Sequence, residues 1–174
     1  MANYDLRKSP GHLLRRAQQY AHDLHSNAVG ADGPTPRQFE VLHVVSRNKG
    51  ISQTDLVKAT GIDRSTLADM IARMLKKGLL YRSRDKDDAR ANNVSITPSG
   101  QRVLGSAASG VSKADGATLN ALPKAHQAAF MKALGAYADA LDKLAEGGGA
   151  AKPARKKAAK KKAPARKKAK RSRR

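Results

Sequence analysis

The chain has 174 residues, which is enough for one ordinary domain with an appendage. It contains no cysteine, so disulfides, thiolate metal sites and thiol redox switches are excluded. The net charge of +21 is unevenly distributed: residues 147–174 carry fourteen Lys and Arg and no acid, whereas residues 1–146 carry 21 basic and 14 acidic residues. A tail of +14 on a body of +7 indicates a polyanionic partner.

Neither membrane insertion nor export is expected. No apolar run approaches the roughly 20 residues that cross a bilayer, and residues 1–20 lack the uninterrupted apolar core of a signal peptide. Aromatic residues make up only 3 % of the chain, which disfavours a base-stacking surface for single-stranded nucleic acid. We therefore expect a soluble cytoplasmic protein.

The first two predicted helices begin at clear capping signals. Ser9 and Pro10 supply an N-cap and a proline at the first helical position, and apolar residues follow at helical spacing over 9–28. Thr35-Pro36-Arg37-Gln38 is a capping box that begins the second helix. That helix carries Phe39, Leu42 and Val45 toward a core.

Residues 52–77 fit a helix-turn-helix. A short helix begins at Ser52 and ends at Gly61, and Asp63 caps a second helix that Gly78 closes. The second helix has an apolar face of Leu67, Met70, Ile71, Met74 and Leu75, and an opposite face of Arg64, Ser65, Thr66, Asp69, Arg73 and Lys76. Such a polar and basic face can bring its N-terminal residues to base edges in the major groove. An αα-hairpin with a solvated outer face is the alternative.

The hydrophobic period changes after Gly78. Residues 79–84 and 94–97 are short strand candidates, and the polar segment 85–93 between them predicts a hairpin with a long exposed tip. A basic hairpin after a helix-turn-helix makes a winged helix, whose tip can reach the adjacent minor groove. Thr97 and Pro98 then cap a helix that extends to about residue 118 and is rich in small residues, which permit close approach to a neighbour.

The last predicted helix, roughly 122–145, carries an apolar seam with alternating spacings of four and three. The seam consists of Phe130, Leu134, Tyr137, Leu141 and Leu144. This pattern is coiled-coil-like and favours a dimer interface, although a stripe against the chain's own core is the alternative. From Gly147 onward the Lys/Arg-rich sequence has no hydrophobic residue larger than Ala or Pro, so the tail is predicted to be disordered when free.

Residues 50–100 resemble the MarR family of bacterial transcription regulators. The resemblance is carried by Leu56, Gly61, Ile62, Asp63-Arg64-Ser65-Thr66, Lys77-Gly78-Leu79, Arg82, Asp85, Asp88-Ala89-Arg90-Ala91, Ile96, Thr97 and Gly100. The flanking helices fit the family's terminal dimerisation helices, so the resemblance covers about residues 9–145. It implies a mainly α (α+β) fold with a dimerisation helix over 1–33, a winged helix-turn-helix domain over 34–100, C-terminal dimerisation helices over 101–146 and a disordered tail over 147–174.

The resemblance also implies a nucleoid-associated homodimer that reads two half-sites of double-stranded DNA, and we expect it to act as a repressor. The residues expected at DNA are Arg64, Ser65, Thr66, Asp69, Arg73, Arg82, Arg84, Asp88 and Arg90. In the family the arginine matching Arg90 contacts DNA at the wing tip, and the acid matching Asp88 helps to hold the wing. The sequence departs from the family at Val57, where Ala is usual, and at Asp87 and Ala89, which leave the wing less basic.

Members of this family are commonly released from DNA by small anionic, often aromatic, ligands. The facing segments here carry His12, Arg15, Arg16, Tyr20, Arg37, His43 and Arg47. Several cations close together suit an aromatic carboxylate or the phosphates of an aromatic acyl-CoA. A solvated helix face, or contact with phosphate, is the alternative for each arginine.

Other function classes are less well supported. No nucleophile motif or nucleotide fingerprint is present, so neither catalysis nor a cofactor is expected. His22 and His25 lack a third metal ligand, so a surface or dimer-packing role is predicted for them, and Asp87 and Asp88 lie on an exposed loop unsuited to acid/base chemistry. The basic tail also suits an architectural, nonspecific DNA-binding nucleoid protein. It lacks the apolar face that membrane attachment needs.

Overall fold

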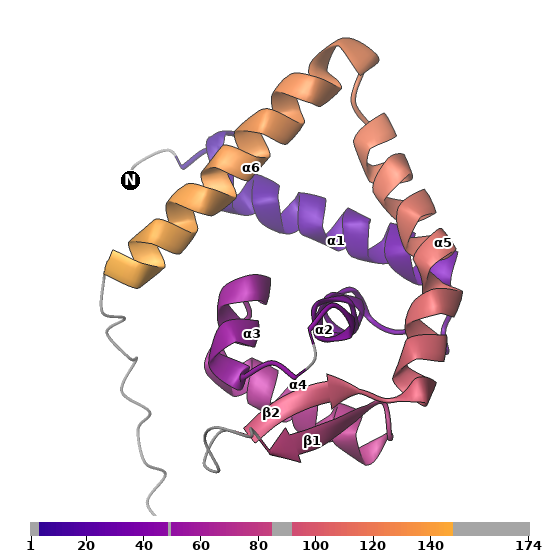
Figure 1. Cartoon of the computed structure of the whole chain (residues 1–174). Helices are drawn as coiled ribbons and strands as arrows, with labels where there is room; N and C mark the ends of the chain where they lie inside the picture. Colours follow the sequence, from indigo (N-terminus) through magenta and orange to yellow (C-terminus); the bar gives the residue numbers. More distant parts are fainter. Residues whose placement is uncertain (1–3, 49, 85–91, 148–174) are drawn as a thin grey trace, which may run out of the picture.

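The computed structural model describes residues 4–48, 50–84 and 92–147. Its elements, in chain order, are a 3-10 helix η1 (Leu6–Lys8), α1 (Pro10–Val29), α2 (Pro36–Ser46), α3 (Gln53–Thr60), α4 (Arg64–Lys76), β1 (Leu80–Arg84), β2 (Asn92–Ile96), α5 (Pro98–Asn120) and α6 (Lys124–Gly147) (Figure 1). Every predicted helix and both predicted strands are confirmed, with ends that differ by about two residues.

Polar side chains set the starts of the helices. The side chains of Ser9, Thr35, Ser52, Asp63 and Thr97 each accept a hydrogen bond from a backbone N–H in the first turn of the helix that follows. These bonds satisfy backbone donors that have no partner inside the helix. The capping signals predicted from the sequence are therefore confirmed.

Helices α2, α3 and α4 and the two-stranded antiparallel sheet form the winged domain (residues 36–96). Its core residues include Leu42, Leu56, Ile71 and Met74, all fully buried. The register runs from Leu80 opposite Ile96 to Arg84 opposite Asn92.

A short third segment joins this sheet. Ile51 and Val94 exchange two backbone hydrogen bonds, with N···O distances of 3.0 and 2.9 Å. Ile51 directly precedes the N-cap of α3, so this bridge connects the base of the wing to the start of the helix-turn-helix.

Small residues let α5 pack closely on α1. Ala107, Gly110 and Ala114 are buried on α5, and a Cβ added at Gly110 would lie 2.6 Å from the carbonyl oxygen of Ala28. The close approach that the sequence predicted for this Ala- and Gly-rich helix is confirmed. Because α5 follows directly from β2, this crossing fixes α1 relative to the winged domain.

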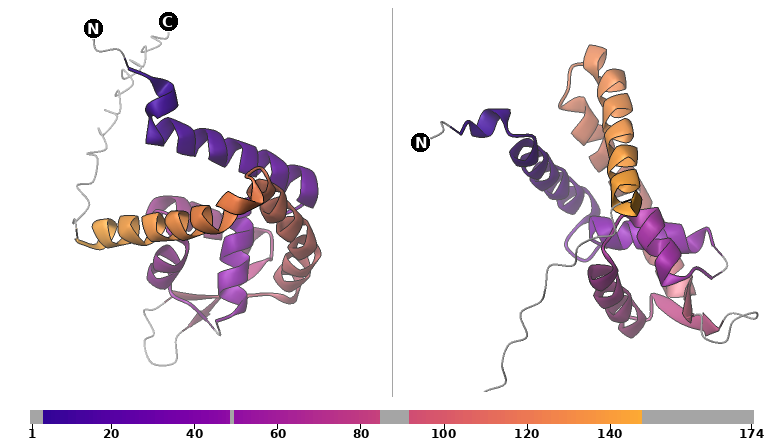
Figure 2. Two further views of the ribbon diagram at one scale, coloured as in Figure 1. Left: turned by 90° about the horizontal axis from the view of Figure 1, so that it is seen from above. Right: turned by 90° about the vertical axis from the view of Figure 1, so that its left-hand side faces the viewer.

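Helix α6 does not pack against the core. Figure 1 shows it running back above α1, and the right-hand view of Figure 2 shows α1 and α6 diverging as two arms. Its seam residues are exposed, from 40 % for Leu134 to 70 % for Leu144. The interpretation of this seam as a stripe against the chain's own core is therefore wrong, because no described residue of α6 is buried.

Within the described ranges, no helix has the length and apolar character needed to cross a membrane.

Candidate functional site

The first turn of α4 is held by Asp63. The Asp63 Oδ1 atom accepts hydrogen bonds from the Thr66 backbone N–H at 3.0 Å and from the Ser65 hydroxyl at 2.7 Å. Hydrogen bonds from Thr66 and then from Ser65 lower the pKa of the Asp63 carboxyl below its ordinary range. Asp63 is therefore ionised at neutral pH, and the turn expected to meet DNA is fixed in position.

Helix α4 has the two faces that its sequence predicts. Leu67, Met70, Ile71 and Met74 are buried. On the other face Arg64, Ser65, Asp69 and Arg73 are exposed, and Thr66 is half-buried. The polar face is therefore open to a partner.

One further residue of this surface, Thr54, was not predicted from the sequence. The Arg64 Nη2 atom donates a hydrogen bond to Thr54 Oγ1 at 3.3 Å. Thr54 lies in the first turn of α3 and is exposed, so the starts of both helices meet at this surface. The exposed polar position early in the first helix of a helix-turn-helix was the signal that could have identified it.

The base of the wing is tied to the end of α4. The Thr97 hydroxyl lies within hydrogen-bonding distance of the carbonyl oxygens of Gly78 (2.6 Å) and Leu79 (3.1 Å). Arg82 is exposed on β1. The side chain of Arg84, and all of Asp88 and Arg90, lie outside the part of the chain that the structure describes, so their expected contacts with DNA stay predictions.

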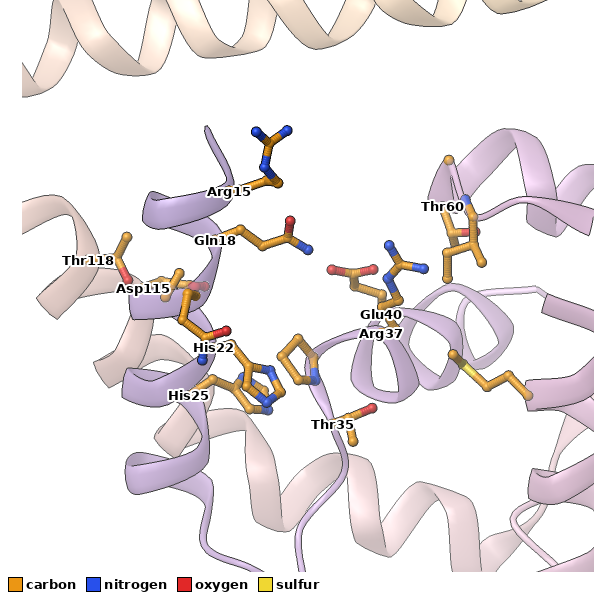
Figure 3. A pocket seen from close by; sticks show the side chains of 16 residues that line it. Arg15, Gln18, His22, His25, Thr35, Arg37, Glu40, Thr60, Asp115 and Thr118 are labelled. Atoms are coloured by element: carbon orange, nitrogen blue, oxygen red, sulfur yellow. The ribbon is translucent and has the colours of Figure 1, made fainter. Parts of the chain in front are cut away.

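A cavity of about 880 Å³ lies between α1, the start of α2, the turn joining α3 to α4, and α5 (Figure 3). Its lining residues are Arg15, Gln18, Gln19, Ala21, His22, His25, Thr35, Pro36, Arg37, Glu40, Thr60, Gly61, Ile62, Met70, Asp115 and Thr118. The cavity thus shares part of its wall with the helix-turn-helix.

Two of the seven residues predicted to face an effector line this cavity, namely Arg15 and Arg37. The other five, which are not among its lining residues, are His12, Arg16, Tyr20, His43 and Arg47. The ring of His43 instead stacks on Phe39, with centroids 6.2 Å apart. Arg47 follows the last turn of α2, at the end opposite to the cavity.

Several lining residues were not predicted. Gln18, His22 and His25 follow Arg15 at helical spacings of three or four, so the phase of α1 could have identified them. No comparable signal marks Asp115 or Thr118, because only the crossing of α5 over α1 brings them to the cavity.

His25 differs from its predicted role at a surface or dimer contact. It is buried within its own chain, and its Nε2 atom lies 2.9 Å from the carbonyl oxygen of Pro34. Since a carbonyl can only accept, Nε2 is the protonated nitrogen. This bond holds the segment before α2 against α1. Across the described ranges, no group of three or more His, Asp or Glu side chains is suited to hold a metal ion.

The cavity contains acids as well as cations. Glu40 and Asp115 line it together with Arg15 and Arg37. Burial raises the pKa of the Glu40 carboxyl above its ordinary value and Asp115 adds to the effect, whereas the charges of Arg37 and His25 oppose it. The cavity is therefore less cationic than the sequence predicted.

Comparisons with known proteins agree with this architecture. Residues 32–91 match the model of the MarR family. The transcriptional regulator HosA of Escherichia coli O127:H6 is 34 % identical over 98 residues, which are 56 % of this chain and 73 % of HosA. This chain spans 57 % of the length of a putative transcriptional regulatory protein for the hcr operon of Thauera aromatica and 73 % of the length of HosA.

Two solved structures share most of the fold. The PcaV transcriptional regulator from Streptomyces coelicolor, in complex with its natural ligand, has a TM-score of 0.73 and 33 % identity, with 81 % of this chain and 99 % of PcaV covered. BpsR of Bordetella bronchiseptica, whose DNA binding is regulated by 6-hydroxynicotinic acid, has a TM-score of 0.73 and 30 % identity, with 79 % and 99 % covered. The fold, the family match and these relatives together place the chain in the MarR family of transcriptional regulators.

Proposed function

We propose that this protein is a homodimeric, sequence-specific DNA-binding repressor that a small anionic ligand releases from its operator. The observation that carries the proposal is the shared wall between the cavity and the helix-turn-helix. Thr60, Gly61 and Ile62 of the turn, and Met70 of α4, line the same cavity as Arg15 of α1. A ligand bound there contacts the element that presents α4 to DNA.

The dimer is supported by apolar side chains that the single chain leaves exposed. They lie on η1, α1 and α6, and include Leu6, Leu13, Leu14, Phe130 and Leu141. A large exposed apolar surface marks an interface in a soluble protein. A second copy covering these arms would present two α4 helices to two half-sites of one duplex.

A footprint with added ligands tests the whole proposal. The protein is expected to protect two half-sites whose centres are about one helical turn, roughly 10 base pairs, apart. Benzoate and its hydroxylated and amino derivatives are the first ligands to add, and at least one is expected to remove the protection. Uniform protection without a preferred site would contradict sequence-specific binding.

The basic tail supports a second candidate function, nonspecific architectural binding. Residues 147–174 carry fourteen Lys and Arg. Each DNA phosphate that they neutralise contributes about −0.9 to the slope of the logarithm of the binding constant against the logarithm of the salt concentration. The discriminating measurement compares specific and random duplexes at about 150 mM salt, with and without this segment. For the repressor, the truncated chain keeps its preference for the specific duplex. A ratio near one for the truncated chain favours the architectural function.

A further inference from the structure

Helix α4 ends in a tight hydrogen-bonded turn. The Gly78 N–H donates to the carbonyl oxygen of Leu75, and the Leu79 N–H donates to that of Met74, both at 3.0 Å. Gly78 has a φ of 68°, in the left-handed region, so the two bonds form the Schellman motif that closes many helices. The motif uses the N–H groups of Gly78 and Leu79, and their carbonyl oxygens need partners from elsewhere.

Thr97 supplies those partners. Its backbone N–H donates to the Leu79 carbonyl oxygen at 3.0 Å, and its hydroxyl oxygen lies 2.6 Å from the Gly78 carbonyl oxygen. Because the Leu79 carbonyl already accepts the Thr97 N–H, the shorter contact with Gly78 is the one that takes the hydroxyl proton. The same hydroxyl oxygen accepts a hydrogen bond from the Gly100 N–H at 3.0 Å, as the N-cap of α5.

One hydroxyl therefore joins the end of α4 to the start of α5. A hydroxyl can donate one proton and accept another, and Thr97 does both between the two helices. Packing reinforces the link, since a Cβ at Gly100 has no room beside the Leu79 carbonyl. The first turn of α5 thus lies directly against the backbone of the turn that closes α4.

Helix α5 extends this contact to the arms of the molecule. From Thr97 it runs to Gly110, where its backbone meets α1, and it then leads into α6 (Figure 1). In the proposed dimer, α1 and α6 are the arms that the second copy covers. The orientation of α4 relative to α5 therefore helps to set the distance and angle between the two α4 helices of the dimer.

We propose that Thr97 is a positioning residue whose hydroxyl fixes the end of α4 to the start of α5 and thereby makes the dimer selective for one spacing between its two half-sites. This inference rests on the proposed dimer that reads two half-sites of one duplex. Thr97 itself needs no contact with DNA. One added base pair moves a half-site by about 3.4 Å and turns it by about 34°, so a dimer with firmly held α4 helices cannot follow the change.

Three substitutions of Thr97 separate its two hydrogen bonds. Thr97→Ser keeps both the donor and the acceptor. Thr97→Asp keeps an acceptor that caps α5 at least as well as Thr, but an ionised carboxylate has no proton to donate to Gly78. Thr97→Val keeps the shape of the side chain and removes both bonds. Loss of the cap and loss of the link to α4 are thereby measured apart.

The experiment measures binding of the full-length protein to three duplexes by fluorescence anisotropy, at pH 7 and about 150 mM salt. The duplexes carry the footprinted operator with its natural spacing, and with one base pair added or removed between the half-sites. The spacing ratio is the affinity for the natural operator divided by the affinity for each altered one. Thr97→Ser should keep the ratio of the wild type. In Thr97→Asp and Thr97→Val the ratio should fall by about 2- to 10-fold, which is what one hydrogen bond of ordinary strength contributes.

A purely structural role for Thr97 predicts a different result. If Thr97 only stabilised α5, Thr97→Val would lower the Tm and weaken binding to all three duplexes by the same factor, and Thr97→Asp would resemble the wild type. The added charge of Thr97→Asp weakens binding to all three duplexes alike, so it cancels from the spacing ratio.

The proposal is overturned if Thr97→Asp and Thr97→Val keep the wild-type spacing ratio, or if Thr97→Ser loses it. It is also overturned if the ratio falls only in variants that light scattering shows to have dissociated into monomers.

The proposed function can fail separately. If the wild type prefers the operator to a random duplex and the natural spacing to the altered ones, but no variant changes the ratio, only the role of Thr97 fails. A wild type that prefers the operator equally at every spacing overturns the role of Thr97 and leaves sequence-specific binding intact. If the wild type binds a random duplex as well as the operator, the proposed function fails and the role of Thr97 fails with it.

Discussion

At the scale of single residues, Asp63 and Arg64 have different roles at the start of α4. The Asp63 carboxylate points back to the helix and accepts hydrogen bonds from Ser65 and Thr66. The Arg64 guanidinium points outward and reaches Thr54 at the start of α3. An anionic residue is compatible with a DNA-binding surface here because its charge stabilises the positive end of the helix dipole.

Arg64 and Thr54 give a graded prediction for DNA binding. If Arg64 contacts a base edge, Arg64→Ala weakens operator binding by about 1–3 kcal/mol. Thr54→Val keeps the shape of the side chain but removes the acceptor that orients Arg64, so it should weaken binding less and relax the base preference at one position. A gel-shift titration at fixed salt against operators varied at single base pairs measures both. Equal losses for every operator would indicate phosphate contacts instead.

Glu40 gives a prediction about pH and folding. Burial raises the pKa of this acid in the folded chain, whereas an unfolded glutamate titrates near about 4.3. Below that pH both states are protonated and nothing is lost. As pH rises, the unfolded state releases its proton first, so the folded state becomes relatively less stable until Glu40 ionises there too.

The measurement is the Tm of the wild type and of Glu40→Gln at pH 4 and pH 7. The variant cannot ionise, so its Tm should exceed that of the wild type by more at pH 7 than at pH 4. Asp32→Asn, at an exposed loop residue outside the cavity, should show no such widening. A gap that narrows as pH rises would mean that Arg37 and His25, which lower the pKa, outweigh burial and Asp115, which raise it.

At the scale of elements, the crossing of α1 and α5 positions the cavity. Gly110 lies against the backbone of Ala28 at this crossing. The cavity begins about one turn away from the crossing, at His25 on α1 and at Asp115 on α5. Backbone cannot rotate away as a side chain can, so the spacing of the two helices depends on the missing Cβ.

Gly110→Ala should therefore separate α1 from α5. The added methyl group meets the Ala28 carbonyl at 2.6 Å, and the resulting overpacking should destabilise the protein by about 1–3 kcal/mol. Gly105→Ala is the matched control in the same helix, because a Cβ there meets nothing within 4 Å. That variant should be neutral or up to about 1 kcal/mol more stable. Urea denaturation compares the two, and similar losses would show that the crossing does not require glycine.

At the scale of the whole molecule, the arms α1 and α6 leave large apolar side chains exposed in a single chain. Leu134, Tyr137 and Leu141 are between 40 % and 46 % exposed, although the seam they form has the spacing of a helix interface. The winged domain has a buried core of its own. A substitution that separates the two copies should therefore leave the winged domain folded.

Leu141→Asp tests this separation. A carboxylate in the seam of α6 should convert the proposed dimer to a monomer, because burying an unpaired charge in an interface costs free energy. Lys132→Asp introduces the same residue on the opposite face of α6 and should leave the dimer intact. Light scattering gives the assembly state, and circular dichroism should show the helices of the winged domain retained. A Leu141→Asp variant that stays dimeric would place the interface elsewhere.

Local sequence was sufficient for the elements of this protein. Capping residues at Ser9, Thr35, Ser52, Asp63 and Thr97 begin helices α1 to α5 through contacts within four residues, so the starts of these helices could be predicted without knowledge of the fold. The two faces of α4 follow in the same way from helical periodicity.

The cavity was predicted only in part, because it depends on contacts between residues far apart in the chain. Arg15 and Arg37 were identified as cations on facing helices, but charge alone did not separate them from Arg16 and Arg47, whose helical phase or position directs them elsewhere.

What the sequence by itself determined was therefore the set of helices, the wing strands, the outer face of α4 and the family. Tertiary structure decided the rest: the burial of His25 against Pro34, the position of Asp115 in the same cavity as Glu40, and the exposure of the α6 seam. The physical reason is the range of the interactions. Caps and amphipathic faces arise within a few residues, whereas a cavity and an unpartnered arm exist only after distant helices have packed.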